Sequence, residues 1–465
     1  MLNNEMLRAL QQLVGSDNLL TDPADCWVYG YDNSRRHALP WAVVFPITHE
    51  QVVALVQLAN LHAVPLVAHG RGTATTGAAV PIQGGIVVSF ERMTRIIMCD
   101  PVNRLMIVEP GVSNQLVQET AKQEGFFWAP DPSSAYFSSV GGNLACNAAG
   151  PRAVKYGTCR ENTLGLRVVT GQGESLDTGV YTTKGVVGYD LTRLVIGSEG
   201  TLALITQATL KLLPLPAAKR TWQVTFSSLE AATQAIVNVM QQSLIPSALE
   251  FMDEAALRLI QTYSPGLVHA QARAVLLIEM EGAAGMMEEA AAQIEQACRV
   301  PHFLEIKMAS TEAERLTLWK VRKALSPLLR HFGSQKINED VVLPISRLPE
   351  FIERVYGLAQ RHQLTIVNFG HAGNGNIHVN LLFDADKVQE QEAAQECLRE
   401  IFALVLSLKG TLSGEHGVGL EKLPFINQEL SPVALKLMSD IKRCFDPKGI
   451  LNPGKYGSFS FESKP

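Results

Sequence analysis

Apolar residues recur along this chain at two spacings, one typical of amphipathic helices and one typical of buried strands. Residues 51–62 carry apolar side chains at helical spacing, and Thr48 precedes them as an N-cap with Gln51 at the capping-box position. Residues 41–46, WAVVFP, form a short continuous apolar run of the kind that makes a buried strand. Both kinds of segment alternate as far as residue 130, so the pattern predicts a mixed α+β fold.

Regular periodicity disappears between residues 131 and 150. This segment is small, polar and glycine-rich but carries few charges, and it includes valine, leucine and phenylalanine. A disordered linker would be more charged and less mixed, so we expect a loop packed closely against a ligand. Strands are expected again after it, at 162–170, 194–196 and 200–212.

The second half of the chain repeats the alternation with longer helices. Strands are predicted at 221–227, 248–253, 274–280, 365–373 and 377–384. Helices are predicted near 228–242, 284–298, 312–331, 348–362, 387–408 and 432–445. Two strand–helix–strand passages favour a split βαβ, antiparallel α+β domain.

Length and charge limit the kind of protein this can be. The chain has 465 residues, too many for one compact core, and the prolines Pro214 and Pro216 mark the best candidate domain boundary. The net charge of −5 is not the basic charge that favours binding to nucleic acids or lipid surfaces, so no nucleic-acid partner is expected. A small anionic substrate would therefore need local cations.

Cysteine usage and the N-terminus bear on the compartment. The seven cysteines are scattered, their number is odd and no C-x-x-C occurs, which favours a reducing compartment and argues against thiolate-built iron–sulfur or zinc sites. The first residues show no signal-peptide pattern, and no apolar run approaches the ~20 residues of a membrane span. We expect a cytoplasmic protein.

Three glycine-rich loops lie between predicted strands, at 65–80, 130–150 and 197–206. Glycines beside Thr73, Thr75 and Thr76 expose backbone N–H groups and hydroxyls, which suits a diphosphate. No G-x-G-x-x-G opens a helix and no Gly-Lys-Ser/Thr ending is present, so neither a Rossmann fingerprint nor a P-loop is predicted. One such loop is commonly only a turn, whereas three could line one long cofactor.

Histidines and a carboxylate gather in two further glycine-rich motifs. His371 and His378 flank a Gly-Asn-Gly-Asn turn, and Glu415 and His416 stand together in SGEHGVG. In an unbroken strand the two histidines would point to opposite faces, but the glycines of the turn allow both rings to converge. Two histidines and a glutamate suit a catalytic metal with open positions. A metal-free reading, in which imidazolium groups bind a substrate carboxylate, stays open.

Motifs in order along nearly the whole chain resemble the FAD-binding oxidoreductases of the vanillyl-alcohol-oxidase/PCMH type. The matching segments are FPITHEQVVALVQLAN at 45–60, R-G-T-x-x-x-G-A at 71–78, DPSSxxxxSVGGNLACNAAGP at 131–151, YG at 156–157, GSEGTLALIT at 197–206 and DPKGILNPGKY at 446–456. This resemblance implies a PCMH-type FAD-binding domain at 1–215. It also implies an antiparallel-sheet α/β cap domain at 216–419 that carries the metal site, and a C-terminal helical segment at 420–465 that returns to the FAD domain.

The resemblance also implies which positions bind the cofactor. Five would hold the FAD diphosphate: Arg71, Gly72, Thr73, Gly77 and Ala78. Eight would line the flavin side: Pro130, Asp131, Ser134, Ser139, Gly141, Gly142, Asn143 and Asn147. Three would lie near the adenosine half and one near the isoalloxazine: Glu199, Gly200 and Ile205, and Asn452. His69 precedes the glycine pair instead of following it, so the FAD is expected to be non-covalent.

The two histidine motifs resemble those of the subgroup that oxidises D-2-hydroxy acids, which includes D-lactate, glycolate and D-2-hydroxyglutarate dehydrogenases. That likeness implies that His371, His378 and Glu415 bind a divalent metal, with zinc expected first and manganese or iron as alternatives. It implies that His416 is the base. The metal would polarise the 2-hydroxyl while hydride leaves for flavin N5.

The substrate carboxylate needs a cation as well. Arg322, on a predicted helix, could give a bidentate contact, and Lys336 is the second candidate. The subgroup resemblance supports both as substrate-binding residues. Ser326 stands where some relatives selective for longer diacids carry a threonine, which leaves the substrate length open.

The expected activity is therefore an FAD- and metal-dependent dehydrogenase of a small D-2-hydroxy acid, D-lactate first. D-2-hydroxyglutarate dehydrogenase and the FAD subunit of a glycolate oxidase complex are the alternatives. Electrons would pass to a quinone, a cytochrome or an electron-transfer flavoprotein, with peripheral membrane attachment through that acceptor, and a homodimer is an expected state. A peroxide-forming oxidase and a non-redox FAD transferase share many of the motifs.

Overall fold

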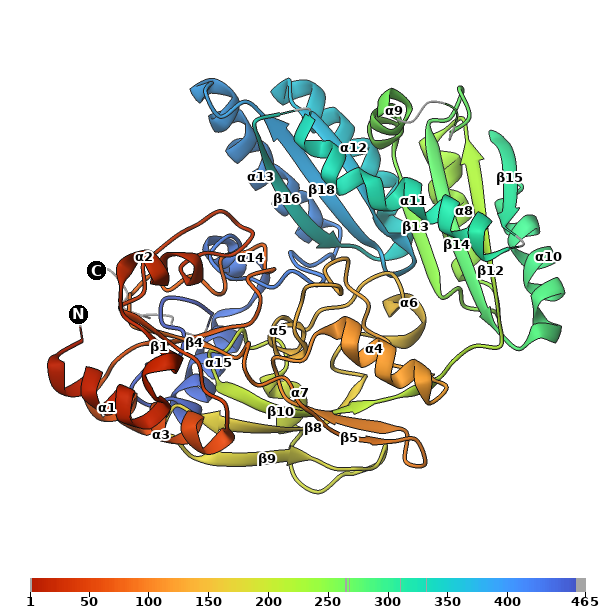
Figure 1. The fold of residues 1–465 in the computed structure, drawn as a ribbon. Helices are drawn as coiled ribbons and strands as arrows, with labels where there is room; N and C mark the ends of the chain where they lie inside the picture. The colour runs from red at the N-terminus through yellow and green to blue at the C-terminus, as the bar shows by residue number, and fades with distance from the viewer. Residues whose placement is uncertain (1, 264–265, 267, 310, 332, 457–465) are drawn as a thin grey trace. The chain divides into compact units, whose positions relative to one another are not determined.

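The computed structural model of the chain describes residues 2–263, 266, 268–309, 311–331 and 333–456 (Figure 1). The chain divides into two compact units. The first unit consists of Met1–Gly150, Gly157–Leu215 and Glu415–Pro465, and the second of Pro151–Tyr156 and Pro216–Gly414. Helices and sheets are present in both, which confirms the α+β prediction.

The first unit contains two main sheets and a short strand pair. A four-stranded sheet has the order β1 (Leu19–Leu20), β2 (Ala42–Val44), β4 (Ile86–Ser89) and β3 (Leu66–His69), with β2, β4 and β3 parallel. A five-stranded antiparallel sheet has the order β5 (Ile96–Asp100), β6 (Leu105–Val108), β10 (Ala203–Lys211), β8 (Thr163–Thr170) and β9 (Ser175–Gly179). The strand pair is β7 (Phe126–Phe127) with β11 (Leu213–Pro214).

Each main sheet of this unit has its own apolar core. Buried residues of β2, β4 and α3 form one cluster, and buried residues of β6, β8 and β10 form the other. The helices are α1 (Asn4–Val14), α2 (Pro23–Cys26), α3 (His49–His62), α4 (Asn114–Gln123), α5 (Val140–Cys146), α7 (Leu191–Val195), α14 (Ile426–Glu429) and α15 (Pro432–Phe445), with 3-10 turns at Ser16–Asn18, Trp27–Tyr29 and Leu423–Phe425. Thr48 caps α3 as predicted, since its side chain accepts the N–H of Gln51.

Two predictions for this unit are wrong. The strand expected at 194–196 is the end of helix α7, because the Asp190 side chain accepts the N–H of Arg193 and starts a helical turn. The segment 131–150 is not one irregular loop, because Ser139 caps helix α5 within it. A short apolar run does not distinguish a buried strand from a buried helical turn.

The second unit is built on one seven-stranded sheet, which is antiparallel as the sequence pattern predicted. Five of its strands were predicted, whereas those at 303–309 and 335–342 were not. The order is β15 (Phe303–Ala309), β12 (Ala218–Phe226), β14 (Ala274–Gly282), β13 (Ala248–Met252), β17 (Thr365–His371), β18 (Asn376–Phe383) and β16 (Gln335–Val342) (Figure 1). Its helices are α6 (Ala153–Tyr156), α8 (Leu229–Met240), α9 (Glu254–Tyr263), α10 (Met287–Cys298), α11 (Glu312–Leu328), α12 (Leu348–His362) and α13 (Val388–Ser407), with 3-10 turns at Ala284–Met286, Leu329–His331, Ile345–Arg347 and Ala372–Asn374.

One face of this sheet is unusually polar. Residues that pair across adjacent strands point to the same face, and so do residues two apart along a strand. The register Glu250↔His371, Phe369↔His378 and His378↔Asp340 therefore places these side chains together. Helices α9 and α11 cover this face through an apolar cluster that includes Phe369.

Candidate active site

A tight hairpin brings His371 and His378 together. His371 ends β17, His378 lies in β18, and the 3-10 turn Ala372–Asn374 followed by Gly375 joins the two strands. The Nε2 atoms of the two rings are 3.5 Å apart, the rings are nearly perpendicular at 87°, and each residue is 7% exposed. The predicted convergence of the two imidazoles across a glycine-rich turn is present.

Gly375 is a position of the hairpin that has no room for a side chain. Its φ is 73°, and a Cβ added there would lie 1.9 Å from the carbonyl oxygen of Leu343. We expect Gly375→Ala to destabilise the second unit by about 2 kcal/mol or more, through left-handed strain and the clash. The measurement is the denaturant midpoint of the full chain.

Gly357 is the matched control for that substitution. It lies inside helix α12, and an added Cβ would meet nothing within 4 Å. Gly357→Ala is therefore expected to leave the midpoint unchanged or to raise the stability by about 0.5–1 kcal/mol. An equal loss in both variants would contradict the role given to the turn.

A buried carboxylate holds the first histidine in place. Glu250 of β13 is 0% exposed; its Oε1 lies 2.5 Å from Nδ1 of His371 and its Oε2 accepts from Nε of Arg322 at 2.6 Å. The Arg322 guanidinium also lies over the ring of Phe369, 4.7 Å from its centroid. Predicted substrate residue Arg322 and predicted ligand His371 thus share one partner.

The charge state of Glu250 fixes the imidazole tautomer. Burial acts to raise the pKa of this carboxyl, but the positive charges offered by His371 and Arg322 lower the pKa to about 2. An ionised carboxylate only accepts hydrogen bonds. Nδ1 of His371 therefore carries a proton in either charge state of the ring, and in the neutral ring Nε2 has the lone pair that a metal ion needs.

Strand β16 contacts the second histidine motif through Asp340. Asp340 is fully buried and pairs with His378 in register. Its Oδ2 accepts from the N–H of Gly414 at 2.8 Å, and its Oδ1 accepts from the hydroxyl of Ser413 at 3.3 Å. Asp340 thus anchors the residue immediately before Glu415.

The predicted metal ligands form one cluster. Glu415 is joined directly to Gly414, and the ligand atoms offered by His371, His378 and Glu415 all lie within 4.8 Å of one another. Two imidazole nitrogens and a carboxylate oxygen are a donor set that suits zinc, manganese or iron and leaves further positions open. These three residues could hold a divalent cation.

His416 lies in a segment that the first unit holds through its backbone. The hydroxyl of Thr76 donates to the carbonyl of His416 at 3.3 Å. The carboxylate of Glu199 accepts the N–H groups of Val418 and Gly419 at 2.5 and 2.9 Å. None of these three bonds uses the His416 side chain, which is half-buried.

The three glycine-rich loops of the first unit also lie together. The amide of Asn452 donates to the carbonyls of Ala78, in the first loop, and Glu199, in the third, at 2.9 and 2.8 Å. The second and third loops are joined by backbone bonds, including one from Glu199 N–H to the carbonyl of Ala145 at 2.8 Å. The N–H of Gly150 in the second loop donates to Glu415 at 2.7 Å.

Several polar side chains predicted at the cofactor already hold these loops. Asn143 donates to Ser138 at 3.2 Å, and the Asn147 oxygen accepts from Thr158 at 2.8 Å. Ser139 caps α5, and the carboxylate of Glu199 is used on the segment that follows His416. What the loops offer a cofactor is mainly their backbone and small side chains.

The first loop suits a diphosphate. Gly72 and Gly77 have φ values of 63° and 78°, which L side chains rarely adopt. The hydroxyl of Thr75 is buried, and among the described residues it has no hydrogen-bond partner. A buried polar atom of this kind beside exposed glycine backbone fits a bound polar group.

Lys336, the second candidate for the substrate carboxylate, lies on the polar face of the second unit's sheet. Lys336 is half-buried and pairs with Leu382, so its side chain points to the same polar face as His378.

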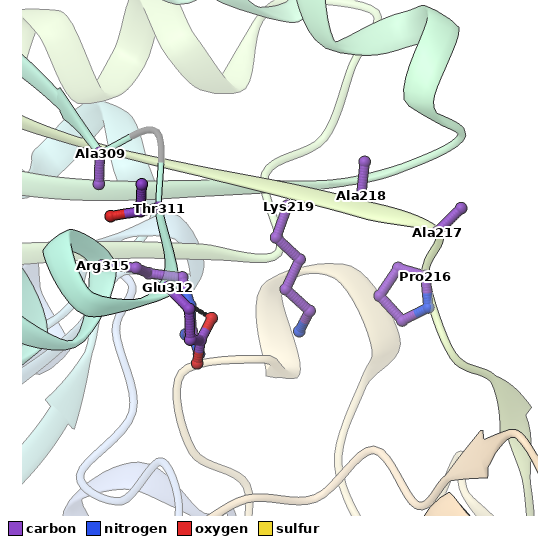
Figure 2. A pocket seen from close by; sticks show the side chains of 8 residues that line it. All are labelled: Pro216, Ala217, Ala218, Lys219, Ala309, Thr311, Glu312 and Arg315. Atoms are coloured by element: carbon purple, nitrogen blue, oxygen red, sulfur yellow. Dashed lines mark hydrogen bonds and ion pairs between the residues drawn. The ribbon is translucent and has the colours of Figure 1, made fainter.

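A hollow in the second unit lies elsewhere, where β12 begins and α11 starts (Figure 2). Its cations are engaged by acids, since Lys219 pairs with Glu281 at 2.7 Å and Arg315 with Glu279 at 3.3 Å. The described residues that line the hollow include no histidine, unlike the cluster of His371, His378 and Glu415.

Comparisons with known proteins now identify the family. Residues 215–456 match the C-terminal domain of FAD linked oxidases, and residues 40–179 match an FAD binding domain. The chain belongs to the FAD-linked oxidases. The glycine-rich first and second loops fall within the matched FAD-binding region, and His371, His378 and Glu415 fall within the matched C-terminal domain.

Relatives that match nearly the whole length of this chain indicate which group of FAD-linked oxidoreductases it belongs to. Glycolate oxidase subunit GlcD of Bacillus subtilis is 35% identical, over 98% of this chain and 97% of its own. D-2-hydroxyglutarate dehydrogenase of Stutzerimonas stutzeri is 32% identical, over 97% of this chain and 98% of its own. D-lactate dehydrogenase of Anaerostipes hadrus is 33% identical, over 90% of each chain. The chain is an FAD-linked oxidoreductase of the D-2-hydroxyacid dehydrogenase and glycolate oxidase group.

A solved structure confirms the fold class. p-Cresol methylhydroxylase with substrate bound superposes with a TM-score of 0.80 at 17% identity, over 98% of this chain and 97% of that one. At this identity the likeness concerns the fold alone, and it confirms the predicted PCMH-type architecture. Among the residues that the structure describes, no helix is long and apolar enough to cross a membrane.

Proposed function

We propose that this chain oxidises a small D-2-hydroxy acid, with D-lactate as the first candidate, to its 2-oxo acid in a reaction that uses FAD and a divalent metal ion. The observation that carries the proposal is the histidine cluster in an FAD-linked oxidoreductase. His371, His378 and Glu415 offer a metal donor set, and Glu250 connects His371 to the cation Arg322. A 2-hydroxy acid has the two groups that this arrangement suits.

The two bound groups would supply different chemistry. A divalent cation held by His371, His378 and Glu415 supplies Lewis acidity, which makes a coordinated hydroxyl more acidic; zinc is our first candidate, with manganese or iron as alternatives. FAD held non-covalently by the three glycine-rich loops supplies a hydride acceptor at N5. The residues proposed to contact FAD are the individual cofactor positions predicted from the sequence, of which Arg71 is the first and Asn452 the last.

The protein's own side chains would bind the substrate and move the proton. Arg322 offers a planar guanidinium to the carboxylate, and Lys336 offers a point charge from the same polar face. A ring nitrogen of His416 would accept the proton of the 2-hydroxyl, while C2, the carbon that bears this hydroxyl, gives up its hydride to the FAD. The loop bonds from Thr76 and Glu199 hold the backbone on which His416 is carried.

The chemistry needs a second reaction partner. Reduced flavin must pass its electrons on, and a quinone, a cytochrome or an electron-transfer flavoprotein are the proposed acceptors. The relatives are named for glycolate, D-2-hydroxyglutarate and D-lactate. Glycolate, as substrate of an FAD subunit within a glycolate oxidase complex, is the second candidate, because the chain is 35% identical to such a subunit.

An anaerobic flavin-bleaching screen tests the proposal. We expect D-lactate to bleach the bound flavin and L-lactate to leave it oxidised, because one fixed metal, one fixed cation and one base discriminate between enantiomers. Glycolate and both enantiomers of 2-hydroxyglutarate complete the panel and set the substrate length. The measurement is the loss of flavin absorbance after mixing in the absence of oxygen.

Each outcome of the screen decides between functions. Bleaching by glycolate alone would support the glycolate oxidase subunit, and bleaching by D-2-hydroxyglutarate alone would support the diacid dehydrogenase. No bleaching by any hydroxy acid, with FAD bound and metal supplied, would overturn the proposed reaction. Oxygen consumption after bleaching separates an oxidase from a dehydrogenase that needs another acceptor.

A further inference from the structure

A single buried carboxylate connects two parts of the proposed site. Glu250 lies in β13 between β14 and β17, and its side chain is 0% exposed. One oxygen faces Nδ1 of His371 and the other accepts from Nε of Arg322. A change in the position of this carboxylate would therefore move an imidazole and a guanidinium together.

The other contacts of Arg322 restrict it further. Its side chain is 12% exposed, and its guanidinium lies 4.7 Å from the centroid of the Phe369 ring. The Phe369 ring is in turn 5.9 Å from the ring of His378. Phe369 thus contacts both Arg322 and His378 on the polar face of the sheet.

A neighbouring carboxylate shows what a purely structural glutamate looks like in this sheet. Glu279 lies on β14, on the same face as Glu250, and is 5% exposed. It accepts from the hydroxyl of Thr221 at 2.9 Å, the indole of Trp319 at 3.0 Å and the guanidinium of Arg315 at 3.3 Å. Both glutamates pair with an arginine of α11, but only Glu250 contacts a candidate metal ligand.

We propose that Glu250 is a positioning residue: it orients His371 toward the metal ion and fixes Arg322 for the substrate carboxylate, so that metal binding and substrate binding depend on one side chain. This inference rests on the function proposed above and extends it to a residue outside the predicted site. Glu250 contacts neither the proposed metal nor the substrate directly, so its effect acts through its two partners.

The physical reason is the behaviour of metal-bound imidazoles. A carboxylate that accepts from Nδ1–H fixes the ring orientation and makes Nε2 a better donor to the metal. Arg322 in turn balances the charge that Glu250 brings into the interior, and its planar fork keeps its remaining N–H groups in one orientation. Removal of the carboxylate would free both groups to rotate.

The test is Glu250→Gln in the full chain with FAD bound, compared with Glu279→Gln. We expect Glu250→Gln to weaken zinc binding by about tenfold to a hundredfold, measured by competition with a chromogenic chelator. The same variant should raise KM for D-lactate, because Arg322 loses its anchor. Glu279→Gln should leave zinc affinity and KM at their wild-type values, although it also removes a buried charge paired with an arginine.

A second variant guards against a simple loss of folding. Glu250→Gln leaves the Arg322 charge without its acid, so the double change Glu250→Gln/Arg322→Gln removes both charges together. With native FAD absorbance and thermal unfolding, the double variant should still bind zinc more weakly than wild type. Wild-type zinc affinity in a folded Glu250→Gln or double variant would overturn the proposal, and so would an equal loss of affinity in Glu279→Gln.

The same measurements separate this inference from the proposed function. If His371→Ala binds zinc as well as wild type does, the metal site itself is wrong. If His371→Ala loses zinc but Glu250→Gln keeps it, only the positioning role is wrong. If zinc binding follows both predictions while no hydroxy acid bleaches the flavin, the reaction is wrong and the role of Glu250 toward the metal stands.

Discussion

His416→Ala is expected to keep its FAD and to lose flavin reduction by D-lactate by about 10³-fold, the typical contribution of a general base. Cofactor binding should survive because the segment around His416 is held through its own backbone groups, which the substitution leaves in place. Thr76 donates to the carbonyl of His416, and Glu199 accepts N–H groups from the two residues after Gly417. The measurement is stopped-flow flavin bleaching without oxygen, beside the FAD absorbance of the purified variant.

Two controls give that result its meaning. His362→Ala removes another imidazole, which ends helix α12 and lies 2.8 Å from Glu400 of α13, and this variant should bleach at the wild-type rate. Added imidazole should restore part of the rate in His416→Ala, because a free base can enter the space left by the side chain. A wild-type bleaching rate in His416→Ala would remove this histidine from the proton-transfer step.

The local motifs could be predicted from the sequence because glycine fixes geometry within a few residues. An odd separation between His371 and His378 allows convergence only across a sharp reversal, and Gly375 with its positive φ makes that reversal. The helix at 348–362 and the strand that follows it from residue 365 were predicted from apolar periodicity alone. These features depend on neighbours in sequence, so one sequence suffices to predict them.

Glu250 could not be predicted in the same way. It lies in ALEFM, a strand whose apolar neighbours mark it only as buried. Its contact with His371 depends on the pairing of β13 with β17, two strands that are far apart in the sequence. Strand order is a property of the whole sheet, and no local pattern encodes which buried strand will lie beside another.

Strand β16 and its Asp340 were missed for a related reason. Five of the eight residues of QKINEDVV are charged or polar, a composition typical of an exposed loop. In the structure it is the last strand of the sheet, and Lys336, Asn338 and Asp340 lie on the same face as His378. A strand that contributes to a polar site lacks the apolar signal by which strands are recognised.

Removal of the metal ion is expected to abolish substrate-dependent flavin bleaching while the FAD stays bound. Two of the three proposed ligands, His371 and His378, lie in the second unit's hairpin, whereas the glycine-rich loops proposed for FAD lie in the first unit. Treatment with a chelator followed by dialysis should therefore lower the bleaching rate by at least about 10²-fold, and zinc or manganese should restore it.

His378→Ala is the matching variant. It removes one of three ligands and should show the chelated behaviour even when metal is supplied. Wild-type protein should gain about 2.7 kcal/mol of stability at a metal concentration one hundred times Kd, read as a higher unfolding temperature, whereas His378→Ala should not. Full bleaching in protein that elemental analysis shows to be metal-free would favour the alternative in which these imidazoles bind the substrate carboxylate themselves.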